Sequence, residues 1–249
     1  SRLDEAWAAA VKLKELFPES KEMGDRYKFV DGLKTQRQLS RNVMELANYL
    51  FQTNEKEKIK LLVSSAPNLI ANNPLVANLK KQFIPSKSWE KDEVALFCGP
   101  GWTCWSPKSL GRTNETEFVG GSEEAVIYLT KELQKLGWKV TVFADPGAEQ
   151  GLHDGVNWLP YYDFNEKDSF NILISWRQVG LVDKNINAKK TYVWCHDVIN
   201  QLDYTDDRLS KLEKVIVLSE AHRQTAPKIP DHKMFVSSNG INLQEENEK

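Results

Sequence analysis

The chain has 249 residues, of which 41% are hydrophobic and 27% charged, enough apolar material for one large domain or two small ones. Its net charge of −2 leaves no basic footprint for nucleic acid or an anionic membrane, no apolar run approaches a bilayer span, and no signal peptide is visible. Three cysteines, an odd number in a long chain, favour a reducing compartment, so we expect a cytoplasmic protein.

The first 86 residues carry apolar side chains at helical spacing, and prolines follow two of the helical segments. We expect five helices, at residues 3–17, 21–33, 35–51, 55–65 and 74–83. Helices joined by short turns are typical of tetratricopeptide-like hairpins, but these segments do not repeat at a fixed period of 34 residues. The pattern predicts an all-α module, either a packed helical extension or a solenoid that binds a partner or acceptor.

A polar segment with a proline, residues 84–92, separates this module from a second pattern. From residue 93 to 243, short apolar runs alternate with short helical segments, which predicts an α/β fold with a Rossmann-like, doubly wound parallel sheet. We expect strands at residues 94–98, 140–144, 171–175, 191–195, 215–218 and 234–237, with an edge strand within 156–162. Residues 244–249 are interpreted as a truncated linker or tail.

The clearest unit is a glycine turn, an amphipathic helix and a buried strand. Gly120 and Gly121 predict a turn with freedom at positive φ, and Ser122 is expected to cap the helix. Glu123 falls in the first turn, where the helix dipole favours negative charge, and Gly137 is expected to end the helix. A glycine turn that opens a helix after a strand holds phosphate or sugar in many α/β folds, but glycine also serves there for steric reasons.

Residues 99–119 form a loop of more than 20 residues between the first strand and this helix. Its position at the carboxyl edge of the sheet is where ligands bind in such folds, and long loops in compact domains are usually functional or disordered. The loop contains Trp102, Trp105, Lys108 and Arg112. We interpret it as part of a substrate pocket; the alternative is a mobile surface loop.

Four short motifs follow one another in the second half of the chain. They are the glycine turn with its helix ending in Leu133 to Val142, then WCHD at 194–197, VIVLS at 215–219 before EAHR, and SNGIN at 238–242. In this order they resemble the N-terminal domain of the retaining GT-B glycosyltransferases, over about residues 93–243. Trp138 stands where that family usually has histidine.

The resemblance implies the acceptor-binding half of a retaining glycosyltransferase, with a UDP- or GDP-sugar as co-substrate and no further cofactor. It implies front-face transfer assisted by the leaving phosphate. His196 would be the catalytic residue that touches the sugar. The donor side would involve Gly120, Gly121, Glu123, Asn239 and Gly240. The acceptor side would be shaped by Trp102, Trp105 and Arg112.

The resemblance also places the main donor-binding residues in a C-terminal domain that this sequence does not contain, so we expect the chain to be inactive without that domain in cis. The acceptor can be a glycan, a lipid or a protein. One alternative is a non-catalytic adaptor with a degenerate Rossmann-like domain. Another is a dinucleotide-dependent oxidoreductase, which the missing GxGxxG pattern disfavours although Asp145 follows the second strand.

His196 follows a buried strand, and an imidazole there can bond to a sugar hydroxyl or a leaving phosphate. The alternative is a histidine bonded within a loop, which is the part we expect for His222. The cysteines do not have the spacing of a zinc site, and Cys195 and His196, as neighbours on a strand, point to opposite faces. We therefore expect no metal, and we interpret Cys98 and Cys195 as small buried strand residues.

Overall fold

The computed structural model describes residues 2–66, 70, 73–83, 85–101, 103–110 and 119–240. The chain forms two compact units, Ser1–Pro85 and Ser86–Lys249. The division falls inside the proline-containing segment 84–92. No helix in the described ranges is both long and apolar enough to cross a bilayer.

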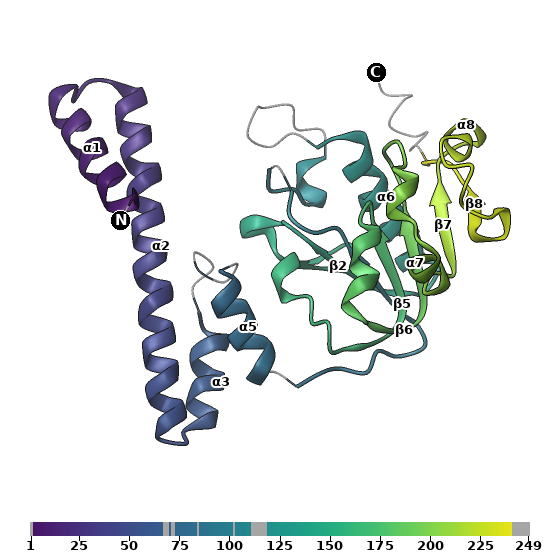
Figure 1. The fold of residues 1–249 in the computed structure, drawn as a ribbon, viewed down its shortest axis with the longest axis horizontal. Coiled ribbons are helices and arrows are strands. Elements are labelled where there is room, and N and C mark those ends of the chain that lie inside the picture. The colour runs from purple at the N-terminus through teal and green to yellow at the C-terminus, as the bar shows by residue number, and fades with distance from the viewer. Residues whose placement is uncertain are drawn as a thin grey trace. The chain divides into compact units, whose positions relative to one another are not determined.

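The N-terminal unit is built from helices in its described residues (Figure 1). They are α1 (Arg2–Leu16), α2 (Lys21–Gln52), α3 (Lys56–Ser64) and α5 (Pro74–Phe83). Ser20 begins α2 as its N-cap, because its hydroxyl accepts a hydrogen bond from the Met23 N–H at 3.4 Å. A small buried cluster joins two of these helices, with Ala47 and Leu50 of α2 packed on Ile59 and Val63 of α3.

The expectation of two helices at 21–33 and 35–51 is wrong, since α2 runs through both as one helix of 32 residues. Lys34, between the two expected segments, is a good helix former and no proline interrupts the run. Gly32 lies within the helix in an open position, where an added Cβ would meet nothing within 4 Å. One glycine costs about 1 kcal/mol relative to alanine, which is too little to end a long helix.

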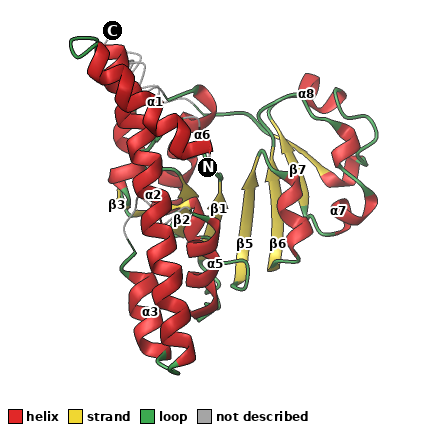
Figure 2. Ribbon diagram, turned by 60° about the vertical axis from the view of Figure 1, so that its left-hand side comes forward, coloured by secondary structure: helices red, strands yellow, loops and turns green. Residues whose placement is uncertain are grey.

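In its described residues, the second unit is an α/β fold around a mostly parallel sheet of eight strands (Figure 2), which confirms the α/β part of the expected fold class. The strand order is β3-β4-β2-β1-β5-β6-β7-β8, and β3 alone runs antiparallel to its neighbour. The strands are β1 (Glu93–Phe97), β2 (Lys139–Ala144), β3 (Gly151–His153), β4 (Val156–Pro160), β5 (Ser169–Trp176), β6 (Asn187–Trp194), β7 (Lys214–Val217) and β8 (Met234–Val236).

Strand β3 was not expected, and it makes β4 an inner strand instead of the predicted edge. The two strands form a hairpin through Asp154 and Gly155, whose φ values are 49° and 77°. Two consecutive left-handed residues are what a tight two-residue hairpin turn requires, and Asp-Gly is a favoured pair for it. The signal was therefore present in the sequence.

Fewer α-helices connect the strands than the alternating pattern predicts. They are α6 (Gly121–Lys135), α7 (Asp206–Ser210) and α8 (Glu220–Gln224), and the connections from β4 to β5 and from β5 to β6 contain short 3₁₀ turns instead. Helix α6 is the long one, and it ends as expected, because Gly137 follows the C-cap with φ at +91°.

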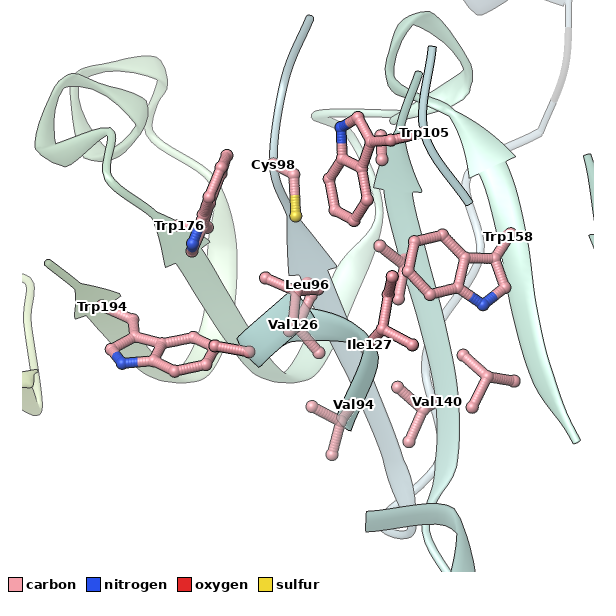
Figure 3. Packing of buried hydrophobic residues seen from close by; sticks show 14 of the residues in the cluster. Val94, Leu96, Cys98, Trp105, Val126, Ile127, Val140, Trp158, Trp176 and Trp194 are labelled. Carbon is pink, nitrogen blue, oxygen red and sulfur yellow. The ribbon is translucent and has the colours of Figure 1, made fainter. Parts of the chain in front are cut away.

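The core lies on both faces of the sheet. On the face that we call the α6 face, Val126 and Ile127 of α6 pack on Leu96 and Val140 (Figure 3). The described connections after β4 cover the opposite face. Phe164, between β4 and β5, packs against Phe97 and Phe143. The segments after β5, β6 and β7 pack against Val193 and Val215. Helix α6 therefore covers one face of the sheet, and the later described connections cover the other.

Candidate functional site

The strand order reverses direction between β1 and β5, because the chain builds outward from β1 to β2 and β4 on one side and from β5 to β8 on the other. In open parallel sheets, ligands bind beyond the carboxyl ends of the strands at such a switch point. Here Gln178, just after β5, donates its amide N–H to the Cys98 carbonyl after β1 at 3.1 Å. The next residue, Gly99, has φ at +71°, and a Cβ there would lie 2.3 Å from the Gln178 amide nitrogen. The glycine therefore permits this close approach.

Helix α6 opens at the same edge, two residues earlier than expected. Its N-cap is Gly120 with φ at −80°, and Gly121 is already helical, so neither glycine uses a positive φ. The expectation that Ser122 caps the helix is wrong, because its hydroxyl lies past the helix start and donates to the Glu123 carboxylate at 2.8 Å. The N-cap Gly120 has no side chain with which to cap the first turn, whose backbone N–H groups have no acceptor within the helix.

Gly121 is not required by the packing of the described chain. A Cβ added to it would meet no heavy atom within 4 Å. Among the described residues, nothing fills the space beside the Gly121 backbone, and such a space lets an anionic or hydroxyl group approach the first N–H groups.

His196 lies just after β6, on the α6 face. Its ring contacts two indoles, with centroid distances of 4.5 Å to Trp194 and 5.8 Å to Trp176. Its Nε2 atom is buried, and no described residue offers it a hydrogen bond. Burial, and after it the Arg177 guanidinium and the His222 imidazole, lower the pKa of His196 from 6.5 to about 4, against the opposing effect of the Asp197 carboxylate. The imidazole is therefore neutral at physiological pH.

Arg177 connects β5 to the loop after β6. Its backbone is left-handed, with φ at 65°, and its N–H donates to the Trp194 carbonyl at 2.8 Å. Its guanidinium lies 4.8 Å from the Trp176 ring centroid and pairs with the Asp197 carboxylate. A non-glycine residue in this conformation is uncommon and is stabilised by the contacts around it.

His222 supports the loop after β6 from the side of α8. Its Nε2 and the Asp197 carbonyl oxygen are 2.7 Å apart, while its Nδ1 accepts from the Leu218 N–H at 3.3 Å. These two bonds are compatible when Nε2 carries the proton. Ser219 caps α8 by accepting from the His222 N–H at 3.0 Å. Asp197, in the loop that follows His196, is therefore held at its backbone carbonyl by His222 and at its carboxylate by Arg177.

Trp105 is a core residue. Its side chain is 3% exposed, and its ring packs against Trp158 and Trp176 at centroid distances of 5.5 and 6.0 Å. Figure 3 shows it beyond the end of the central strands, close to Cys98. In this buried position the ring supports the carboxyl edge of the sheet, and its expected role on the acceptor side remains a prediction. The other two expected acceptor-side residues, Trp102 and Arg112, lie outside the described residues.

The expected donor-side residues are divided between two places. Gly120, Gly121 and Glu123 begin α6, whereas Asn239 and Gly240 follow β8 and line an apolar groove beside α6. The Asn239 Oδ1 atom is buried and has no hydrogen-bond partner in the described chain. Trp194 forms part of the same groove, so the residues after β8 and the surroundings of His196 share one indole.

The cysteines are not arranged as metal ligands. Cys98 and Cys195 are buried as expected, and burial raises the pKa of both thiols, that of Cys195 to about 11. The Cys195 sulfur lies 3.0 Å from the Tyr204 hydroxyl. In the part of the chain that the structure describes, no group of three or more His, Cys, Asp or Glu side chains could hold a metal ion.

Two residues of this site, Trp176 and Arg177, were not assigned a role from the sequence. The Trp176 side chain is 6% exposed, yet its indole Nε1 has no hydrogen-bond partner among the described residues. The available signal was their position directly after a buried strand at the carboxyl edge. Comparison of the chain with protein-family models, curated protein sequences and solved structures found no match.

Proposed function

We propose that the α/β unit is the acceptor-side half of a retaining glycosyltransferase that uses a nucleotide-sugar donor. In the reaction, the bond between the sugar C1 and the leaving phosphate breaks, and the acceptor oxygen forms the new bond to C1 on the same face. The acceptor hydroxyl proton passes to the leaving phosphate oxygen. The donor domain implied by the family resemblance would complete the site from the C-terminal side.

The observation that carries the proposal is the state of His196. A buried imidazole nitrogen without a partner is costly, and such atoms in a folded protein call for a ligand or an ordered water. Because the ring is neutral, Nε2 can donate to or accept from a sugar hydroxyl according to its tautomer. A charged imidazolium would face the repulsion of Arg177, so a hydroxyl is a better partner for this site than a bare anion.

The start of α6 supports the same function. Its backbone N–H groups and the positive end of its dipole favour a phosphate or a sugar oxygen. Gly121 leaves room beside them, and the strand order places this helix start and His196 at one edge and on one face of the sheet. A transferred sugar between them would be held by the helix on one side and by the imidazole on the other.

Activity should be measured on the full-length native protein, with residues 1–249 alone for comparison. A panel of UDP- and GDP-sugars is screened for nucleotide release. We expect release by the full-length protein alone, and a fall in kcat of about 100-fold for His196→Ala, the loss typical of a group that assists proton transfer or charge stabilisation. His232→Ala is the matched control, because His232 is exposed after α8.

Unchanged activity of His196→Ala would refute the role of this residue. A folded full-length protein that consumes no sugar nucleotide would refute the enzyme and favour the non-catalytic binding module.

A further inference from the structure

An apolar groove runs along the α6 face of the sheet beside the candidate site. We call it the α6 groove, with a wall of Tyr128, Leu129 and Leu133 from α6 and a floor of Ile174, Trp194 and Ile216. Phe235 continues the floor on β8. Its volume is about 370 Å³, which is within the range of small-molecule sites.

The topology explains why this groove is open. From β4 the chain moves to β5, β6, β7 and β8 in one direction along the sheet. Right-handed crossovers in one direction all lie on the same face, and here they pack on the face opposite α6. The α6 face of β5 to β8 therefore receives no crossover helix from the described chain. Parallel sheets are normally covered on both faces, so this apolar surface calls for an occupant.

The groove is continuous with the surroundings of His196. The Trp194 side chain is part of the groove floor and lies 4.5 Å from the imidazole, centroid to centroid. Buried polar atoms without a partner among the described residues are found at the site, in Nε2 of His196 and Nε1 of Trp176, and in the groove lining, in Oδ1 of Asn239. Among the described lining residues only Glu132 carries a charge, and Lys135 neutralises it at 2.6 Å.

This combination matches an amphiphile. An uncharged apolar groove suits a hydrocarbon chain, and the polar atoms at its end suit a hydroxylated headgroup. A covering α-helix would bury the floor as well, but its backbone N–H groups are bonded within the helix and would leave Asn239 Oδ1 without a backbone donor. We infer that the α6 groove binds the hydrocarbon chain of a lipid acceptor whose headgroup hydroxyl lies at His196. That the lipid is an acceptor rests on the proposed function.

The test uses octyl β-D-glucoside below its micelle-forming concentration, with methyl β-D-glucoside as the headgroup alone. Binding to the 249-residue chain is followed by the indole N–H signals of its eight tryptophans in NMR spectra, assigned with Trp→Phe variants. We expect the octyl glucoside to bind at least tenfold more tightly than the methyl glucoside and to shift the signals of Trp176 and Trp194. Equal affinity for the two glucosides, or an unmoved Trp194 signal, would overturn the inference.

Phe235→Ala should weaken octyl glucoside binding at least fivefold, because it removes part of the floor. The ring is 54% exposed on an edge strand, so the variant should fold, and circular dichroism checks this. Leu152→Ala is the control, since Leu152 is 73% exposed on β3 and outside the groove. Equal losses for both variants would contradict the assignment.

In the full-length protein, a Trp194 signal that no longer responds to octyl glucoside would show that polypeptide fills the groove and would also overturn the inference. Octyl glucoside binding without sugar-nucleotide turnover would leave the lipid site standing while refuting the transferase.

Discussion

The titration of His196 gives the most direct physical test of the candidate site. Its pKa is lowered from 6.5 to about 4 by burial between two indoles and by the guanidinium of Arg177 and the imidazole of His222, against the opposing charge of Asp197. The unfolded chain keeps the ordinary value. Between pH 6.5 and 4, the unfolded state therefore binds a proton that the folded state does not. The free energy of unfolding should fall as the pH falls through this window, and the contribution is fully present above it.

The size of the effect follows from the two pKa values. A difference of about 2.5 corresponds to about 3.4 kcal/mol. The ring is only partly buried, so solvent screening reduces the value, and we expect about 1.5 kcal/mol to be lost between pH 7.5 and pH 4. His196→Gln removes the titrating group, so the difference between wild type and variant at the two pH values isolates this residue from the rest of the protein.

Unfolding by urea can be followed by tryptophan fluorescence, because seven of the eight tryptophans lie after residue 85. The ring protons of the four histidines give the pKa values directly by NMR, and His232→Gln serves as the exposed control. A pKa of His196 near 6.5, or the same pH dependence of stability in wild type and His196→Gln, would refute the buried neutral imidazole.

Two glycines allow tests that separate structure from function. Gly121→Ala should stabilise α6 by about 0.5 kcal/mol but lower the activity of the full-length protein at least tenfold. Gly32→Ala in α2 is the control, because Gly32 is also helical and open, and it should leave activity unchanged. Full activity of Gly121→Ala would mean that no ligand uses this space. Gly99→Ala should cost about 2 kcal/mol in urea unfolding, because alanine is strained at positive φ and its Cβ would displace the Gln178 amide. In a Gln178→Ala background the cost should fall to about 1 kcal/mol, that of the backbone alone, and a cost that stays the same would contradict the contact.

The elements with strong local signals could be predicted from the sequence. The apolar spacing of α6 and the glycine that ends it are local properties, and Gly137 has the positive φ that a C′ glycine supplies. The runs that became β1, β2, β5, β6 and β7 carry the apolar residues of inner parallel strands. Their alternation with connecting segments was sufficient for the fold class.

Boundaries that depend on competing local bonds were less accessible. Ser122 has the right residue type for a cap, but its hydroxyl bonds to Glu123, and the helix begins before it. The turn at Asp154 and Gly155 carried a readable signal, yet a three-residue strand is too short for its period to be recognised. In α2, nothing local distinguishes a helix that pauses at Gly32 from one that continues.

The sequence by itself determined which residues lie at the carboxyl edge of the sheet, because residues that follow the end of a parallel strand, such as Cys98 after β1 and His196 after β6, are delivered to that edge. Only the tertiary structure decided which of these ends are neighbours. Strand order is a long-range property, so the contact of His196 with Trp176 and Trp194 depends on β5 and β6 pairing in register. The neutral state of His196 and the burial of Trp105 follow from packing around them, which no local pattern encodes.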